Sequence, residues 1–190
     1  MENPILKRHI TPRLLLRPPH RSLAWAAADF YKKNKAFLME TEPFHDASFF
    51  TAAGQRHLLL AERKAAKKKM QGRFWVQSRQ SGDLLGVVAL NNIVMGSFCS
   101  CFVSYKLGQE YTGQGFAREA MQKLIQIAFE EMRLHRLEAN IMPRNLPSLR
   151  LAEALGFENE GLAKKYLQIG GVWEDHIHMV LLQEKYKGVL

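Results

Sequence analysis

One stretch, residues 103–120, constrains the fold more than any other part of the chain. It begins with strand-like alternation of apolar and polar residues, which gives way to a turn containing Gly113 and Gly115. Apolar residues then recur at helical spacing from Ala117 onward. A strand, a glycine-rich turn and a long helix together predict an anion site, because several backbone N–H groups can point at one phosphate and the helix dipole favours negative charge. A side chain at either glycine would hold that phosphate away from the backbone.

The same pattern is also compatible with a plain connection between a strand and a helix. Two familiar nucleotide motifs do not match it. No Gly-Lys-Ser/Thr sequence ends the turn, which argues against a nucleoside-triphosphate P-loop. The third glycine of a dinucleotide fingerprint is missing, because Arg118 stands three residues after Gly115. The turn by itself therefore indicates an anion site without identifying the ligand.

Length and composition predict one globular domain over residues 1–190, since 47% of the residues are hydrophobic. No run of 18 apolar residues occurs and the first residues resemble no secretory signal, so we expect a cytoplasmic protein without a membrane partner. Cys99 and Cys101 fall on one face of a predicted strand, where a disulfide between them is unfavourable, and we interpret them as core or near-core thiols. His176 and His178 have no third ligand nearby, so no metal site is expected.

The chain is basic, with a net charge of +9. Such a charge is compatible with nucleic acid, the ribosome, an anionic cofactor or simple solubility. The densest group of cations is Arg63–Lys69, in a stretch rich in Ala and Leu. These residues could form the solvated face of a surface helix or could contact phosphates, for instance on a ribosome.

Periodicity predicts a chain with both strands and helices, of the α/β (α+β) class. Ser22 is the expected N-cap of the first helical region, and the second is expected to be interrupted or slackened near Gly54. A short helix should begin after Asn145 and end at Gly156. The expected strands are 13–17, 74–78, 84–90, 98–107 and 136–142 with a final hairpin, and the expected long helical regions are 22–40, 48–70 and 117–132.

Several motifs resemble the GCN5-related N-acetyltransferase family, and in particular its ribosomal-protein-alanine branch. The turn resembles the Arg/Gln-x-x-Gly-x-Gly/Ala loop of that family, although Thr112 stands at the Arg/Gln position. The resemblance implies a mixed, mostly antiparallel sheet of about seven strands flanked by about four helices. The matching segments are Thr112-Gly113-Gln114-Gly115-Phe116-Ala117, Thr11-x-Arg13-Leu14, Pro143-x-Asn145-x-x-Ser148, Leu155-Gly156-Phe157 and Gly171-x-Trp173-x-Asp175-His176.

The resemblance implies that acetyl-coenzyme A is the cosubstrate, with no metal, and that an amine attacks its thioester directly. It places the pyrophosphate against the loop, the pantetheine arm against one strand as if it were a further strand, and Asn145 beside that arm. A backbone amide near Leu107 would then face the developing oxyanion. The implied cofactor residues are Tyr105, Lys106 and Leu107 on the strand, Gly113, Gln114, Gly115, Phe116, Ala117 and Arg118 in the loop, and Asn145.

The catalytic side chains are less directly implied. Many family members protonate the thiolate with a tyrosine at the position of Ala152, whereas the ribosomal branch uses a serine, and Ser148 matches it. Ser148 could equally serve only to cap the short helix. Another subfamily has a glutamate base at the position of Asn140, and Glu138, two residues earlier, could act as the base through water. An α-amino group has a pKa near 7.7–8.0, so a strong base is not required.

The predicted activity is acetylation of the N-terminal α-amine of alanine or serine on a ribosomal protein. A small-molecule amine or antibiotic acetyltransferase is the alternative enzyme, and a ribosome- or RNA-associated protein without turnover is the alternative from another class. The partner is then a protein or peptide N-terminus, bound by a monomer or homodimer. The acidic residues expected nearest the acceptor are Glu42, Asp46, Glu138 and Asp175.

Overall fold

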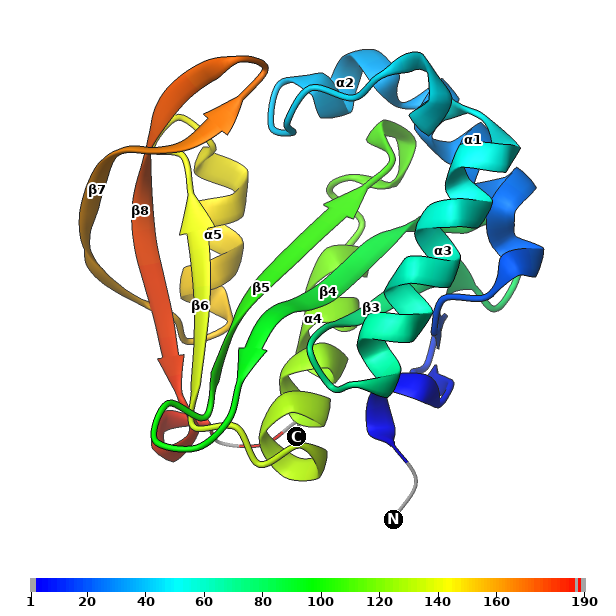
Figure 1. Ribbon diagram of the computed structural model, residues 1–190. Coiled ribbons are helices and arrows are strands. Elements are labelled where there is room, and N and C mark those ends of the chain that lie inside the picture. Colours follow the sequence, from blue (N-terminus) through cyan, green and yellow to red (C-terminus); the bar gives the residue numbers. More distant parts are fainter. Residues whose placement is uncertain (1–2, 187, 189–190) are drawn as a thin grey trace.

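The computed structural model describes residues 3–186 and 188. It contains both strands and helices, in the order β1-β2-α1-α2-α3-β3-β4-β5-α4-β6-α5-β7-β8 along the chain (Figure 1). The strands are β1 (His9–Ile10), β2 (Leu14–Arg17), β3 (Gly72–Ser78), β4 (Leu84–Val94), β5 (Ser100–Leu107), β6 (Arg136–Ile141), β7 (Glu158–Ile169) and β8 (Val172–Leu182). The α-helices are α1 (Ala24–Lys33), α2 (Lys35–Met39), α3 (Ala52–Lys67), α4 (Phe116–Gln126) and α5 (Leu146–Ala154).

The strands form one sheet in the order β1-β2-β3-β4-β5-β6-β8-β7. Neighbouring strands are antiparallel except β5 and β6, which are parallel. The ladder between β5 and β6 runs only from Ser100↔Arg136 to Phe102↔Glu138. Beyond that pair the two strands diverge, and the sheet opens into a V-shaped gap (Figure 1). This gap positions the candidate site.

Side chains alternate between two layers because successive strand residues point to opposite faces of the sheet. Trp75 and Val87 face α1 and α3, whereas Phe74 and Val88 belong to the core beneath α4. All four are at most 1% exposed. Burying such a side chain contributes about 1.5–3 kcal/mol each, so the sheet is held between two apolar layers. Helices α4 and α5 lie on the face opposite α1 and α3 (Figure 1).

The predicted mixed, mostly antiparallel α/β fold is confirmed, with small differences in the counts. The described residues contain eight strands and five α-helices, rather than about seven and about four. The additional elements are β1, which has two residues, and α2, which has five. Both are too short to give a periodic signal in the sequence. No helix among the described residues has the length and hydropathy needed to span a bilayer.

Two local predictions were wrong and one was confirmed. Ser22 does not cap a long helix, because it lies inside a 3-10 turn at Arg21–Leu23 that precedes α1. The N-cap of this 3-10 turn is His20. The second helical region is interrupted near Gly54 as expected, because a 3-10 turn at Ala47–Phe50 ends at the extended residue Thr51 before α3 begins. Gly54 itself lies in the first turn of α3, where an added Cβ would collide with the carbonyl oxygen of Ser48. Cys99 lies before β5 in a left-handed conformation, with φ of 41°, so only Cys101 is a buried strand thiol.

Candidate active site

The open edge of β5 presents main-chain groups to the gap. Gly108 donates its N–H to the carbonyl oxygen of Leu85 at 2.8 Å. This bond determines which residues of β5 pair their main-chain groups with β4. In an antiparallel ladder alternate residues bond to the neighbouring strand, so Lys106 bonds to β4. Tyr105 and Leu107 direct their N–H and C=O groups away from β4, into the gap. An extended, amide-containing ligand can therefore pair with β5, through Tyr105 and Leu107 and not through the main chain of Lys106.

The glycine turn lies between the end of β5 and the start of α4. Gly113 and Gly115 have φ of 73° and 79°, values that L side chains rarely adopt. Gly115 is the N-cap of α4 and has no side chain to bond the first helical N–H groups. Those N–H groups, from Phe116, Ala117 and Arg118, have no acceptor inside the helix. Free N–H groups at the N-terminus of a helix, together with the helix dipole, have the chemistry that an anion requires.

A clamp from the N-terminal segment holds this turn in place. Thr11 Oγ1 donates to Glu119 Oε1 at 2.5 Å, and Arg13 donates from Nε to Glu119 Oε2 at 2.6 Å. Arg13 Nη1 also donates to the carbonyl oxygen of Gln114 at 3.0 Å, and its guanidinium stacks on the Phe116 ring at 4.4 Å. Burial acts to raise the pKa of Glu119, but hydrogen bonds from Thr11 and Arg13 outweigh it and lower that pKa. The carboxylate is therefore charged at neutral pH.

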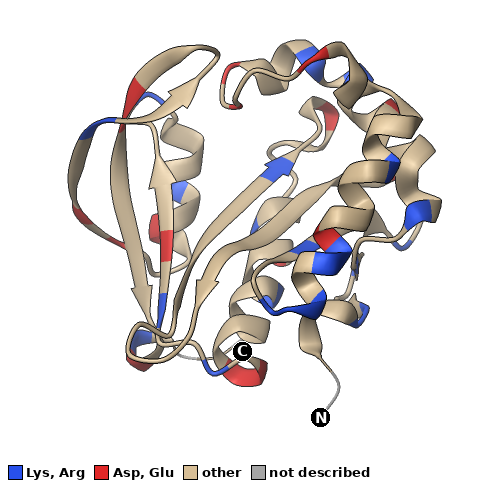
Figure 2. Ribbon diagram, viewed as in Figure 1, with Lys and Arg blue, Asp and Glu red and all other residues tan. Residues whose placement is uncertain are grey.

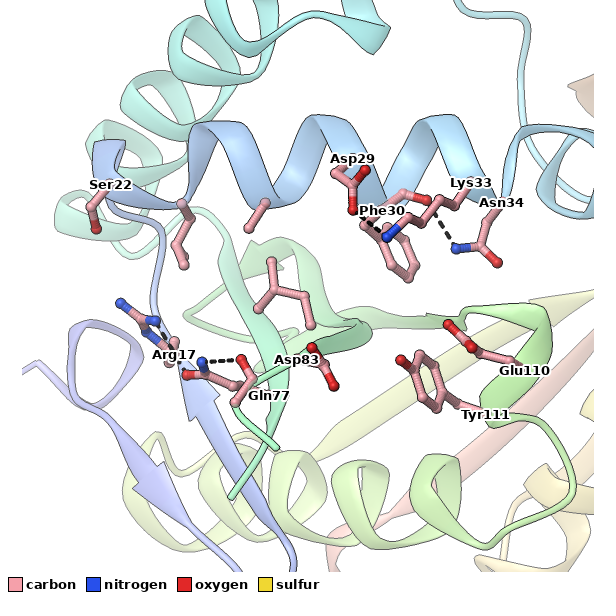
Figure 3. Close-up of a pocket in the computed structure, with 14 residues that line it drawn as sticks. Arg17, Ser22, Asp29, Phe30, Lys33, Asn34, Gln77, Asp83, Glu110 and Tyr111 are labelled. Carbon is pink, nitrogen blue, oxygen red and sulfur yellow. Dashed lines mark hydrogen bonds and ion pairs between the residues drawn. The ribbon is translucent and has the colours of Figure 1, made fainter. Parts of the chain in front are cut away.

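Asn34 anchors the other side of the turn. Its Nδ2 donates to the carbonyl oxygen of Phe30 at 2.9 Å, and its Oδ1 accepts from the N–H of Gln109 at 2.9 Å. Asn34 and Tyr111 lie at one end of a cavity of about 270 Å³ whose other end holds Arg17 (Figure 3). The lining includes three carboxylates, from Asp29, Asp83 and Glu110. Two cations, Arg17 and Lys33, also line the cavity, and Lys33 pairs with Asp29 at 2.7 Å. The carboxylates still outnumber the cations, so the lining does not favour a phosphate.

Tyr105 and Ser148 meet on the α4 and α5 face of the gap. The Tyr105 hydroxyl donates to Ser148 Oγ at 2.8 Å, which leaves the Ser148 proton available for another acceptor. Burial raises the pKa of Tyr105, while the bond to Ser148 opposes that rise, so the phenol is protonated at neutral pH. Asn145 is the N-cap of α5, because its Oδ1 accepts from the N–H of Ser148 at 3.3 Å. The predicted cap at Asn145 is confirmed, and Ser148 is not itself the cap.

Glu138 lies apart from this pair. It occupies the last paired position of the ladder between β5 and β6, before the strands diverge. Arg136 Nε donates to Glu138 Oε1 at 2.8 Å, and the same guanidinium makes two bonds to Glu160. The structure thus brings together Tyr105, Ser148 and Asn145, but it leaves Glu138 bonded to Arg136 at the closed end of the gap.

The opposite face of the gap is closed by the segment after α2 and by the tip of the β7–β8 hairpin. Glu42 is 7% exposed, forms an ion pair with Lys106 and lies 3.0 Å from His45 Nε2. Gly170 at the hairpin tip donates its N–H to the carbonyl oxygen of Glu42 at 3.2 Å. Figure 1 shows this hairpin reaching toward the end of α2. The two segments form the outer wall on the side of the sheet facing away from Ser148.

The acidic residues expected near the acceptor all have protein partners. Asp46 caps the turn at Ala47–Phe50 through the N–H of Phe49, and Glu42 is paired with Lys106. Asp175 Oδ1 accepts from the N–H of Lys165 at 2.8 Å, within an irregular part of the β7–β8 ladder. All four carboxylates, Glu138 included, are engaged with protein groups. They order the segments around the gap and do not form an acidic channel.

The two histidines of β8 lie against an aromatic ring. Tyr166 makes ring contacts with His178 and His176 at centroid separations of 4.9 and 6.0 Å. His176 Nδ1 lies 3.0 Å from the carbonyl oxygen of Glu174. Within residues 3–186 and 188, no cluster of three potential metal ligands is found. Both histidines have structural partners.

The sequence did not predict the roles of Arg13, Glu119 and Asn34. The Thr11-x-Arg13 motif reads as a family signature, but its target, Glu119, lies more than 100 residues later. The only local indication of a role for Glu119 is that an acidic residue stands in the first turn of the helix after the glycine turn. The contact itself depends on the packing of β2 against α4, which periodicity does not reveal.

The glycine turn, the diverging strands and the main-chain groups of β5 define an acetyltransferase site of the GNAT type. An acetyltransferase (GNAT) domain model matches residues 13–158, and the chain belongs to this family. The [ribosomal protein uS5]-alanine N-acetyltransferase of Escherichia coli K12 is 36% identical over 170 residues, which are 90% of this chain and 88% of that protein.

Two solved structures have the same fold over nearly the whole chain. The ribosomal-protein-S5-alanine acetyltransferase of Vibrio fischeri is 33% identical, with a TM-score of 0.89, and the match covers 95% of this chain and 99% of the other. Mycobacterium smegmatis RimJ in complex with a coenzyme A disulfide is 25% identical, with a TM-score of 0.86, and the match covers 92% and 84%. The predicted family and enzyme class are confirmed.

Proposed function

We propose that this chain transfers an acetyl group from acetyl-coenzyme A to the N-terminal α-amine of a ribosomal protein beginning with alanine or serine, in the cytoplasm. The observation that carries the proposal is the gap between β5 and β6, together with the glycine turn that follows β5 and the hydroxyl pair on one face. The 36% identity to an enzyme named for alanine acetylation on uS5 supports the acceptor class.

The residues of this chain fit the cofactor. The N–H groups from Gly113 to Arg118 suit the pyrophosphate, and the main chain of Tyr105 and Leu107 suits the amide groups of a pantetheine arm. When bound, acetyl-coenzyme A supplies the acetyl thioester. The Leu107 N–H points into the gap, where it can donate to a carbonyl oxygen as charge develops on it. Asn145 caps α5 by accepting from the N–H of Ser148, which supports its assignment to the same site.

In this proposal Ser148 donates a proton to the leaving sulfur. Its hydroxyl already accepts from Tyr105, so Tyr105 can supply the proton that Ser148 gives away. The acceptor amine would approach from the opposite face, between the segment after α2 and the β7–β8 hairpin. An α-amine with a pKa near 7.7–8.0 is partly uncharged at neutral pH, so it can attack without a strong protein base. This assigns no step to Glu138.

The test is acetylation of short basic peptides that begin with alanine or serine, with mass spectrometry to locate the acetyl group. The proposal expects the label on the α-amine and no reaction with peptides blocked there. Spermidine and an aminoglycoside serve as comparison acceptors, because a spermidine N(1)-acetyltransferase of Vibrio cholerae is 28% identical over 116 residues. Label on lysine, or turnover only with the small amines, would contradict the proposal.

A further inference from the structure

A second cavity, of about 320 Å³, lies where the end of β2, the turn after it and α3 meet. Three arginines and a histidine contribute to it, and its lining contains no carboxylate. Folding assembles this set from three separate parts of the sequence, of which only the last belongs to the basic run Arg63–Lys69. The lining residues are Leu6, Arg8, Arg17, Pro18, His20, Ser22 and Arg63.

Two of the guanidinium groups are held in place by neutral acceptors. Arg63 Nη1 donates to the carbonyl oxygen of Pro19 at 3.1 Å, and Arg17 Nη1 donates to Gln77 Oε1 at 3.2 Å. A guanidinium has five N–H donors, so both keep donors for a ligand. In the described part of the chain, Arg8, Arg17 and Arg63 make no ion pair with a carboxylate, whereas four other arginines do: Arg13, Arg73, Arg136 and Arg144.

The cavity concentrates positive charge without neutralising it. Burial lowers the pKa of Arg17, and the nearby charge of Arg8 lowers it further. Like charges brought together in a half-buried site repel each other, so an anion bound among them would lower the energy of the folded protein. Phosphate suits such a site because a guanidinium presents two parallel N–H donors to its oxygens.

Basic side chains continue from the cavity along α3. Lys67 stands four residues after Arg63, hence on the same face and about 6 Å further along the helix. Lys64, Lys67, Lys68 and Lys69 are exposed. Figure 2 shows Lys and Arg along α3 and at its C-terminal end. Successive cations at such spacing match a ligand that carries several phosphates in a row.

We propose that the cavity lined by Arg8, Arg17 and Arg63 binds a phosphate group, and that the lysines at the end of α3 extend the site to neighbouring phosphates of an RNA strand. The site is separate from the acetyl-transfer gap, since β2 and β5 are three strands apart, roughly 14 Å. The inference therefore goes beyond the proposed acetyltransferase function and can fail without it.

The test compares wild-type protein with two double variants of equal charge. Arg8→Gln/Arg63→Gln removes two cations from the cavity, and Lys32→Gln/Arg133→Gln removes two exposed cations elsewhere. Binding of a fluorescent 12-nucleotide single-stranded RNA is measured by anisotropy at several salt concentrations, with excess coenzyme A present to keep RNA out of the cofactor site. Thermal stability with and without inorganic phosphate is measured in parallel.

We expect the cavity variant to bind RNA at least tenfold more weakly at low salt, with a salt slope smaller by about 0.7 for each phosphate that it no longer neutralises. It should also lose the stabilisation by phosphate, while the control variant keeps both properties and all three proteins acetylate peptides equally. Unchanged RNA binding by the cavity variant, or an equal weakening in the control, would overturn the proposal. Stabilisation by phosphate without RNA binding would overturn the assignment to RNA.

Discussion

Gly115 carries the conformation on which the phosphate turn depends. With φ of 79° and Arg13 Nη2 only 3.3 Å from an added Cβ, Gly115→Val strains the turn and fills the space a phosphate needs. We expect acetyl-coenzyme A affinity to fall more than tenfold, or by over about 1.4 kcal/mol, in calorimetry. Gly82→Val is the matched control, because φ is 81° there and an added Cβ meets only Gln77 at 3.9 Å. Equal affinity of the two variants for acetyl-coenzyme A would show that the turn does not bind this cofactor.

The bond between Tyr105 and Ser148 predicts a shared role in proton delivery. Ser148→Ala should lower kcat by about tenfold with little change in cofactor affinity, because the thiolate leaves tolerably well without help. Tyr105→Phe should also lower kcat, but it should have no further effect once Ser148 is alanine. Initial rates and cofactor titrations of the three variants check this. Additive losses in kcat, or a fall in stability with normal turnover, would indicate separate or purely structural roles.

At the level of elements, the β7–β8 hairpin is ordered by Asp175, whose side chain replaces a ladder bond at an irregular register. Asp175→Ala should loosen the hairpin wall and raise KM for the peptide several-fold, while cofactor affinity stays unchanged. Asp175→Asn keeps an oxygen acceptor and should restore most of the wild-type KM. A raised KM in the asparagine variant as well would show that the charge, rather than the hydrogen bond, matters.

The elements and the glycine turn could be predicted because their signals are local. Alternation, turn glycines and the Asn145 cap each lie within a few residues of the structure they specify. Long-range contacts could not be predicted in this way. No residue near Glu42 in the sequence predicts its ion pair with Lys106, and none near Arg13 predicts its ion pair with Glu119. The misplaced Ser22 cap has a different origin, because the short 3-10 turn at Arg21–Leu23 gives no periodic signal and is capped by His20.

At the scale of the whole molecule, the clamp at Glu119 links stability to pH. The lowered pKa of Glu119 means that its contribution is present above the unfolded pKa of about 4.3 and is lost as pH falls through the folded value. Glu119→Gln should cost roughly 1–2 kcal/mol at pH 7, limited by solvent screening of the half-exposed Arg13. Its Tm should then fall less than that of the wild type between pH 5 and 3. Parallel Tm curves would contradict the assignment.

Because β5 and β6 diverge beyond Phe102 and Glu138, the gap can be approached from either face of the sheet. The hydroxyl pair lies on one face of the sheet, while the Glu42 segment and the hairpin tip lie on the other. Cofactor and acceptor therefore need not share an entrance, and neither has to leave before the other arrives. Reciprocal initial-rate plots should give intersecting lines, whereas parallel lines would indicate an acetylated enzyme. Access to the site can then be controlled separately for the acetyl donor and for the acceptor, because the two substrates enter from opposite faces of the sheet.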